Sequence, residues 1–359
     1  MAENHETDLI TAALEHHQEA LNLFISHLAT LNAHSWVTFP ALWFFILYEQ
    51  TYGEDPRVME AHLRGVRDVI ASHGRTILAS SLIDDGSSSG EPEERFRVPP
   101  KMINRIALWT IHQDAKASTF GLGGSMIYLL NEKYPDSIDR IFEDSSTALQ
   151  DAWGLMYPAV EDLWDRQVHE MFRLVHENTM LRYQLAKIEK EYYEDEGKGK
   201  TSRKIMQFGR DLKLLEKKFL PFMEPTLSRR IERSALLSNM CVIVAEFLAL
   251  VVQYERLAYD VQSLSLPKLL QVCASLYEYE GPNFLRHVAW ALLVAGFETE
   301  DSVYQSWIIE RFAQLQKSGN NMRQAMILLQ AVFLEKRTST KPIRYSEWLR
   351  DDRFKKFSI

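Results

Sequence analysis

The sequence predicts an all-α protein, built as a single large bundle of mostly antiparallel helices. Glycine and proline are scarce, with 15 and 12 among 359 residues, which suits long helices and disfavours a fold with many turns. Apolar residues recur at spacings of three, four and seven, as on the buried face of a helix. No segment alternates polar and apolar residues like a half-buried strand, and no repeat of fixed period occurs.

The N-terminal part predicts three helices. The first covers about residues 7–31, and the second covers about residues 35–52 and is apolar around its whole circumference, as in a central buried helix. The third helix has clear end signals. Asp55 can accept a hydrogen bond from a first-turn N–H, Pro56 suits the first helical position, and Gly74 provides a left-handed stop.

Two polar segments predict loops. Residues 81–98 are mostly polar, including the run from Asp84 to Pro92, and have too little apolar surface to offset the entropy of ordering, so we expect a mobile surface loop. Residues 192–201 change from acidic to basic and predict a charged loop. Neither loop separates two self-sufficient cores, so we expect one domain over residues 1–359.

The middle of the chain predicts further helices. One covers about residues 99–120 and is broken by the glycines at 121, 123 and 124, after which we expect a short irregular region to Pro158. Later helical patterns span about residues 159–191, 203–218, 226–260 and 266–278.

The last third is also helical. Gly281 and Pro282 begin an apolar segment that Gly296 is expected to end, and Thr299 is expected to cap the next helix. Apolar residues at helical spacing continue to Phe333. Short connections throughout favour antiparallel neighbours.

Charge and cysteine content restrict the function. The net charge of −8 and a pI near 5.8 argue against a DNA-binding surface, because nucleic-acid affinity rests mainly on Lys and Arg. A local basic patch is compatible with that average. The two cysteines, Cys241 and Cys273, lie in apolar runs, which predicts buried free thiols in a reducing compartment.

The sequence shows no signal for export or for membrane insertion. Residues 1–8 are polar and acidic, unlike a secretory leader. The longest apolar stretch, residues 235–252, is interrupted by polar residues and falls short of the roughly 20 apolar residues that span a bilayer. We expect a soluble intracellular protein, nuclear or cytoplasmic, that does not bind membranes.

Catalytic and metal-binding motifs are missing from the sequence. His169 and His176 share a helical face, but they lack the spacing of a zinc-binding helix, so we expect no metal and no cofactor. The glycines at 121–124 follow a helix rather than a strand, which predicts a helix stop and not a phosphate-binding turn. The basic runs 198–204 and 213–218 predict a solvated face.

Four residues are candidates for a site. His62 and Asp114 are polar residues on otherwise apolar helices, and a buried ionisable group must be paired or cost several kcal/mol. A structural pairing is the simpler interpretation, and acid–base catalysis is the functional one. Trp43 and Trp290 lie in aromatic-rich segments that could line a ligand pocket, although core packing explains them equally well.

Several short motifs together resemble the regulatory region of fungal zinc-cluster transcription factors. They are Tyr48-Glu49, Tyr52-Gly53, His62-Leu63-Arg64-Gly65 with Ile70 and Gly74, Arg105 to Trp109 through Gln113-Asp114, and Trp290 to Gly296. The resemblance covers nearly the whole chain. It implies an all-helical regulatory domain of a nuclear protein, one that senses small molecules, contacts other proteins or restrains activation.

The sequence departs from that family in one important respect. A zinc cluster holds two metal ions with six cysteine thiolates, and this chain has two distant cysteines. Direct sequence-specific DNA binding is therefore not carried over, and none of the motifs transfers a defined set of ligand-binding residues.

Two functions remain open. The favoured one is a regulatory or effector-binding module that acts through a small molecule or a protein partner, and formation of a homodimer is left open. The alternative is an enzyme of fungal specialised metabolism, of the isomerase or cyclase type, that uses a cavity in the bundle with His62 or Asp114 as the acid–base residue. A roomy cavity with converging polar groups would favour chemistry.

Overall fold

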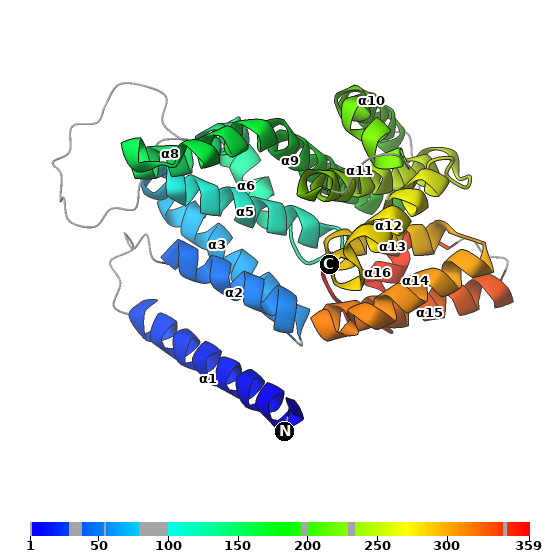
Figure 1. Cartoon of the computed structure of the whole chain (residues 1–359), viewed down its shortest axis with the longest axis horizontal. Coiled ribbons are helices and arrows are strands. Elements are labelled where there is room, and N and C mark those ends of the chain that lie inside the picture. Colours follow the sequence, from blue (N-terminus) through cyan, green and yellow to red (C-terminus); the bar gives the residue numbers. More distant parts are fainter. Residues whose placement is uncertain are drawn as a thin grey trace.

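The computed structural model describes residues 2–28, 38–53, 55–78, 100–194, 200–228, 234–339 and 343–359. Within these ranges every regular element is a helix and there is no strand (Figure 1). The predicted all-α fold is confirmed. The predicted loop at 81–98 lies outside the described residues.

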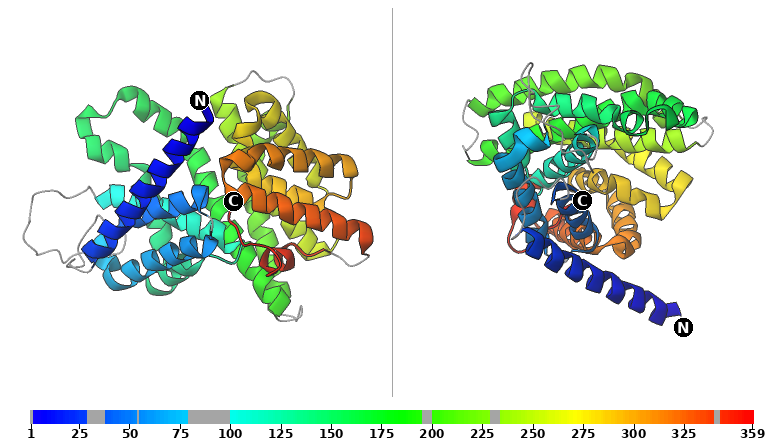
Figure 2. Two further views of the ribbon diagram at one scale, coloured as in Figure 1. Left: turned by 90° about the horizontal axis from the view of Figure 1, so that it is seen from below. Right: turned by 90° about the vertical axis from the view of Figure 1, so that its left-hand side faces the viewer.

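The first three helices are α1 (Ala2–Leu28), α2 (Thr38–Tyr52) and α3 (Pro56–Ile77). Figures 1 and 2 show α1 along the outer edge of the molecule, with its N-terminal end pointing away from the other helices. The cap of α3 is confirmed, because Asp55 Oδ1 accepts a hydrogen bond of 3.0 Å from the backbone N–H of Arg57.

Residues 125–158, expected to be irregular, form short helices instead. After α5 (Pro100–Ser118) come α6 (Ser125–Lys133), α7 (Ser137–Ser146), α8 (Ala148–Trp153) and the 3₁₀ turn η1 (Gly154–Met156). The expectation was wrong because these helices are too short to show a clear period. Their buried residues pack against α5, a long-range contact that local sequence does not reveal.

The longest helix, α9 (Ala159–Glu194), connects the two halves of the bundle by packing on α5 and also on α10 (Lys200–Leu227) and α11 (Ala235–Tyr259). The ends of the predicted loop at 192–201 are therefore helical, and only 195–199 lie outside the described residues. The expected end of α10 near residue 218 was wrong. The helix continues through two prolines, with Phe219 and Met223 buried against the core beyond that point.

α11 is the one described helix that is long and apolar enough to cross a membrane by length and composition. However, 61% of its apolar window is buried inside the fold. Its hydrophobicity therefore serves the protein core, because α9, α10, α12 and α13 all pack against it.

The C-terminal half completes the bundle. Its elements are α12 (Leu266–Glu280), η2 (Pro282–Val288), α13 (Ala289–Glu298), α14 (Ser302–Leu315), η3 (Gln316–Ser318), α15 (Asn320–Thr338) and α16 (Tyr345–Arg350). Every residue of α13 is buried. Figure 1 shows α14 and α15 side by side below α12 and α13, and α14 packs directly on α15.

Two expected helix ends in this region were wrong. Gly296 does not end α13, which continues to Glu298, and a Cβ at Gly296 would lie only 2.7 Å from Leu329 Cδ2. This glycine therefore permits close packing of two helices. The cap of α14 is Asp301 rather than Thr299, since Asp301 Oδ1 accepts a 2.7 Å hydrogen bond from the N–H of Val303.

One contiguous apolar core runs through the described helices from Phe39 to Phe357. Both cysteines belong to it as free thiols, so the prediction that these thiols are buried and unpaired is confirmed. Burial raises the pKa of Cys241 to about 11 and also raises the pKa of Cys273. Neither thiol is poised to ionise near neutral pH.

A glycine allows α10 and α11 to approach closely, and this contact can be tested. A Cβ at Gly209 would lie 2.0 Å from Tyr254 Oη, whereas a Cβ at Gly65 in α3 would meet nothing nearer than 3.7 Å. Ala normally stabilises a helix interior by about 0.5–1 kcal/mol relative to Gly. We expect Gly65→Ala to raise or preserve the free energy of unfolding and Gly209→Ala to lower it by at least about 1 kcal/mol. Equal effects in urea denaturation would contradict the close packing.

Candidate functional site

His62 and Asp114, the two candidate acid–base residues, lie in separate surroundings. His62 stacks on Phe45 of α2 with ring centroids 5.4 Å apart, and its buried Nε2 has no hydrogen-bond partner among the described residues. Burial lowers the pKa of His62, with a smaller contribution from His17. Asp114 lies in α5 and makes a separate set of contacts, and no hydrogen bond or ion pair joins the two side chains.

Asp114 caps the start of α6 from a neighbouring helix. Its Oδ1 accepts a 2.8 Å hydrogen bond from Gly124 N–H, and its Oδ2 accepts two of 3.0 Å from Met126 and Ile127 N–H. Gly124 itself has φ +91°, a left-handed conformation that favours glycine. The carboxyl group therefore satisfies amides that would otherwise be unpaired at the helix start.

The pKa of Asp114 is raised to about 6 by burial, although the bonds from Ile127, Gly124 and Met126 act in the opposite direction. Because the folded-state pKa lies above the unfolded value of 3.8, the neutral form is favoured in the fold. The resulting contribution to stability is complete below about pH 4 and is lost as pH rises through about 6.

The same hydrogen bonds show what the glycine-rich turn does. Its amide N–H groups are already occupied by Asp114, so they cannot cradle a phosphate group. A Cβ at Gly123 would lie 2.4 Å from the Asp114 carbonyl oxygen, so this residue allows the turn to fold back on α5.

The two tryptophans occupy different environments, and neither lines the cavities described below. Trp43 is half-buried in α2 and contacts Phe44 edge-on, with ring centroids 4.9 Å apart. Trp290 is 1% exposed, and its Nε1 donates a 3.0 Å hydrogen bond to Tyr345 Oη.

Arg182 lies against the face of Trp290 at the centre of the bundle. Its Cζ is 3.8 Å from the centre of the indole ring, its Nε donates to Thr119 Oγ1 at 3.0 Å, and its Nη1 lies 3.3 Å from Glu246 Oε2. Its Nη2 donates to the backbone oxygen of Ile359 at 3.3 Å. Each nitrogen of this buried guanidinium therefore has a partner within the fold, so the group is not available to bind a ligand.

A second buried polar pair escaped sequence analysis. His112 Nε2 and His176 Nδ1 are 3.0 Å apart, and Phe142 stacks on His176 with centroids 4.7 Å apart. Burial lowers the pKa of His112 well below its usual value and that of His176 to about 4. Both rings are therefore neutral at pH 7. Within the described residues no group of three or more ligand-type side chains is placed to hold a metal.

The most distinctive surface feature is a basic cleft with a volume of about 770 Å³. It lies beside the glycine-rich turn, between α3, α6, α9 and the C-terminal segment. Five basic residues line it, namely Arg67, Lys187, Lys190, Arg350 and Lys356. Within the described part of the chain, the single carboxylate in its lining is Glu132. A cluster of this sign is unexpected in a chain with a net charge of −8.

The remaining walls of the basic cleft are aromatic and polar. The rings of Tyr128 and Tyr183 and the side chains of Leu129 and Ala186 provide apolar surface. Ser125 contributes a hydroxyl group. The arrangement provides positive charge and apolar surface together, which suits an anion with an organic body.

Sequence reasoning missed this cleft for a physical reason. Lys187 and Lys190 are close in sequence, but Arg67, Arg350 and Lys356 come from distant segments that only the fold brings together. The basic runs recognised in the sequence lie elsewhere, mainly on the exposed face of α10.

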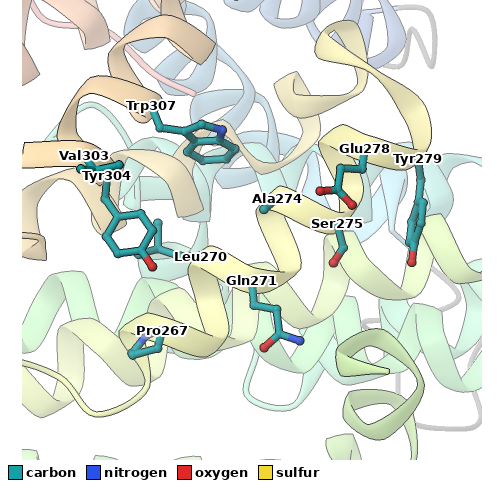
Figure 3. Close-up of a pocket in the computed structure, with 10 residues that line it drawn as sticks. All are labelled: Pro267, Leu270, Gln271, Ala274, Ser275, Glu278, Tyr279, Val303, Tyr304 and Trp307. Carbon is teal, nitrogen blue, oxygen red and sulfur yellow. The ribbon is translucent and has the colours of Figure 1, made fainter. Parts of the chain in front are cut away.

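A groove of similar size, about 790 Å³, separates α12 from α14 (Figure 3). Val303, Tyr304 and Trp307 project from α14, while Gln271 and its neighbours project from α12. Among the described residues that line it, Glu278 is the one with a charge, so the groove offers little charge with which to select a ligand.

Comparison with known protein families gives a match that covers nearly the whole chain. The fungal specific transcription factor domain matches residues 2–354. The chain belongs to this family. No curated protein matches it, and no solved structure matches it either. Membership supports a regulatory role, in agreement with the resemblance seen in the sequence.

The capping role of Asp114 predicts a large mutational effect. Asp114→Ala should lower the free energy of unfolding by about 3 kcal/mol or more, because three amides lose their acceptor in a buried setting. Asp114→Asn retains one acceptor oxygen and should cost less. Asp301→Ala is the matched control, since it removes one exposed cap worth about 1 kcal/mol. Urea denaturation at pH 7 measures all three, and equal losses in Asp114→Ala and Asp301→Ala would refute the assignment.

The histidine pair predicts a pH effect of opposite sign to that of Asp114. The folded-state pKa of His176, about 4, lies below the ordinary value of 6.5. The stability that this pair contributes is therefore complete above about pH 6.5 and is lost as pH falls through about 4. Between pH 7 and pH 4 we expect wild type to lose roughly 2–3 kcal/mol more than His176→Asn in denaturant titrations. Parallel pH profiles for the two proteins would rule this out.

Proposed function

We propose that this domain is a regulatory module whose effector is an anionic organic molecule bound in the basic cleft. The observation that carries the proposal is the convergence of five basic side chains from separate segments on one cavity with a single carboxylate. Like charges gathered in this way repel one another, and a bound anion relieves that repulsion.

The cleft also favours a particular kind of anion. The planar guanidinium groups of Arg67 and Arg350 suit two-pronged contacts with carboxylate or phosphate oxygens. The rings of Tyr128 and Tyr183 suit an apolar or aromatic body attached to that charge. An inorganic ion would use only the first of these features.

Occupation of the cleft would join parts of the chain that are far apart in sequence. Arg350 ends α16, and the segment after it packs into the core through Phe357, whose ring lies 5.2 Å from that of Phe120. A ligand held between α3, α9 and this segment would favour the arrangement in which all three are in place. A change of this kind is how an effector shifts a regulatory domain between states.

The family supports an intracellular and nuclear location for such a module. The net charge of −8 favours action through an effector or partner over direct sequence-specific DNA binding. The enzyme alternative gains no support from the site, because His62 and Asp114 are apart and neither lines the cleft.

The proposal is tested first by binding. The probes are an aromatic sulfonate dye, which has charge and an apolar body, and inorganic pyrophosphate, which has charge alone. We expect the dye to bind more tightly in calorimetric titrations and to raise the melting temperature. The double variant Lys187→Glu/Arg350→Glu should bind it at least about tenfold more weakly, since it replaces attraction with repulsion.

Lys317→Glu is the matched control, because it reverses an exposed charge in η3, outside the cleft. Far-ultraviolet circular dichroism establishes that each variant is folded. Dye affinity that is unchanged in the double variant would exclude the cleft as the binding site.

The regulatory role has its own test. The domain is fused to an unrelated DNA-binding module, and transcription from a fungal reporter gene is measured. We expect wild type and Lys317→Glu to alter transcription equally and the double cleft variant to differ from both. Equal transcription with all three proteins would show that the cleft has no part in regulation.

A further inference from the structure

An exposed apolar corner protrudes where α8, η1 and the start of α9 meet. The exposed fractions are 59% for Trp153, 108% for Leu155, 79% for Met156, 75% for Val160 and 62% for Leu163. Within the described part of the chain, none of residues 159–170 in the first turns of α9 is fully buried. A cluster of large apolar side chains this exposed is typical of a surface that contacts another protein.

The corner is acidic as well as apolar. Residues 151–170 contain five carboxylates and one arginine, and Lys101 pairs with Asp151, so the corner carries a net charge of −3. Two of the carboxylates have partners within the corner, since Asp162 pairs with Arg166 at 2.8 Å and Asp165 accepts a 2.5 Å hydrogen bond from Tyr157 Oη. Glu161 is exposed beside Val160 and Leu163. A partner for this corner needs apolar side chains interspersed with positive charge.

The outer face of α10 has that composition. Met206, Arg210, Lys213, Lys217 and Leu220 follow one another at spacings of four, three, four and three, so they form one stripe along the helix. All five are exposed, with fractions of 60% for Met206 and 56% for Leu220. The next residue of the stripe, Glu224, is the one acid in it, so the stripe carries a net positive charge.

The corner lies at the N-terminal start of α9, whereas α10 runs antiparallel along the second half of α9, because Lys218 of α10 pairs with Glu177 in the middle of α9. Figure 1 shows α8 and α10 along the upper edge with α9 running between them. A two-fold axis that crosses α9 between the corner and the stripe would place the corner of one copy on the α10 stripe of the other, and the same contact would form twice. Such an arrangement leaves neither surface exposed.

We propose that two copies of this chain associate through these surfaces, with the acidic apolar corner of each copy docked on the basic apolar stripe of the other. The charges of the two surfaces are complementary, and both occur in one chain. The association does not require a ligand in the basic cleft.

The test uses two double variants. In a dimer of either variant, the corner of one copy and the stripe of the other have charges of the same sign and repel each other. In Glu161→Lys/Asp165→Lys the net charge of the corner changes from −3 to +1, and it faces an unchanged basic stripe. In Lys213→Glu/Lys217→Glu the stripe becomes acidic and faces an unchanged acidic corner. By sedimentation velocity we expect wild type to form a dimer and each variant alone to associate at least about tenfold more weakly.

The decisive experiment uses an equal mixture of the two variants. In the mixed dimer one contact pairs the two reversed surfaces and the other pairs the two unchanged surfaces, so both contacts are attractive and dimerisation should return to near the wild-type level. Leu155→Asp should also weaken the dimer, whereas Leu264→Asp, at an 88% exposed position outside both surfaces, should not. A monomeric wild type, variants that still dimerise, or a mixture that stays monomeric would each overturn the proposal.

Discussion

The contact on which the bundle most depends is the burial of Arg182. This residue of α9 joins α13 through the Trp290 ring, α11 through Glu246, the end of α5 through Thr119, and Ile359 through its backbone oxygen. Burying a guanidinium is costly unless each of its donors is satisfied. The helices around it must therefore keep one mutual arrangement, because an altered packing would leave a buried charge without partners. This is a stronger constraint on geometry than apolar contact alone, which tolerates sliding.

The parts of the fold that depend on local interactions could be predicted from the sequence, whereas the parts that depend on contacts between distant helices could not. Long helices with continuous periodicity, such as α3 and α9, were predicted with their approximate bounds, and Asp55 was recognised as a cap because the hydrogen bond is local. The short helices α6 to α8 were missed. The cap of α6 comes from Asp114, ten residues before Gly124 and on another helix, so no local pattern contains it. Gly296 was misread as a stop because its packing partner, Leu329, lies in α15.

The candidate site was less predictable than the fold for the same reason. His62 and Asp114 were noticed as polar residues on apolar helices. The structural interpretation given for both residues fits Asp114, whose carboxyl group caps a helix. The basic cleft, by contrast, is assembled from α3, α9 and the C-terminal segment, and its lining residues are unremarkable in their own surroundings. A positive cluster of this kind becomes visible only when distant segments are placed side by side.

The length of α9 has a mechanical consequence. Lys187 in the cleft and Val160 in the corner are 27 residues apart on one uninterrupted helix, a span of ~40 Å at 1.5 Å per residue. Because the helix behaves as a nearly straight rod, a tilt of about 3° at one end displaces the other by ~2 Å. A small tilt at the cleft, within what the contacts of Arg182 permit, would therefore displace the corner by more than it displaces the cleft.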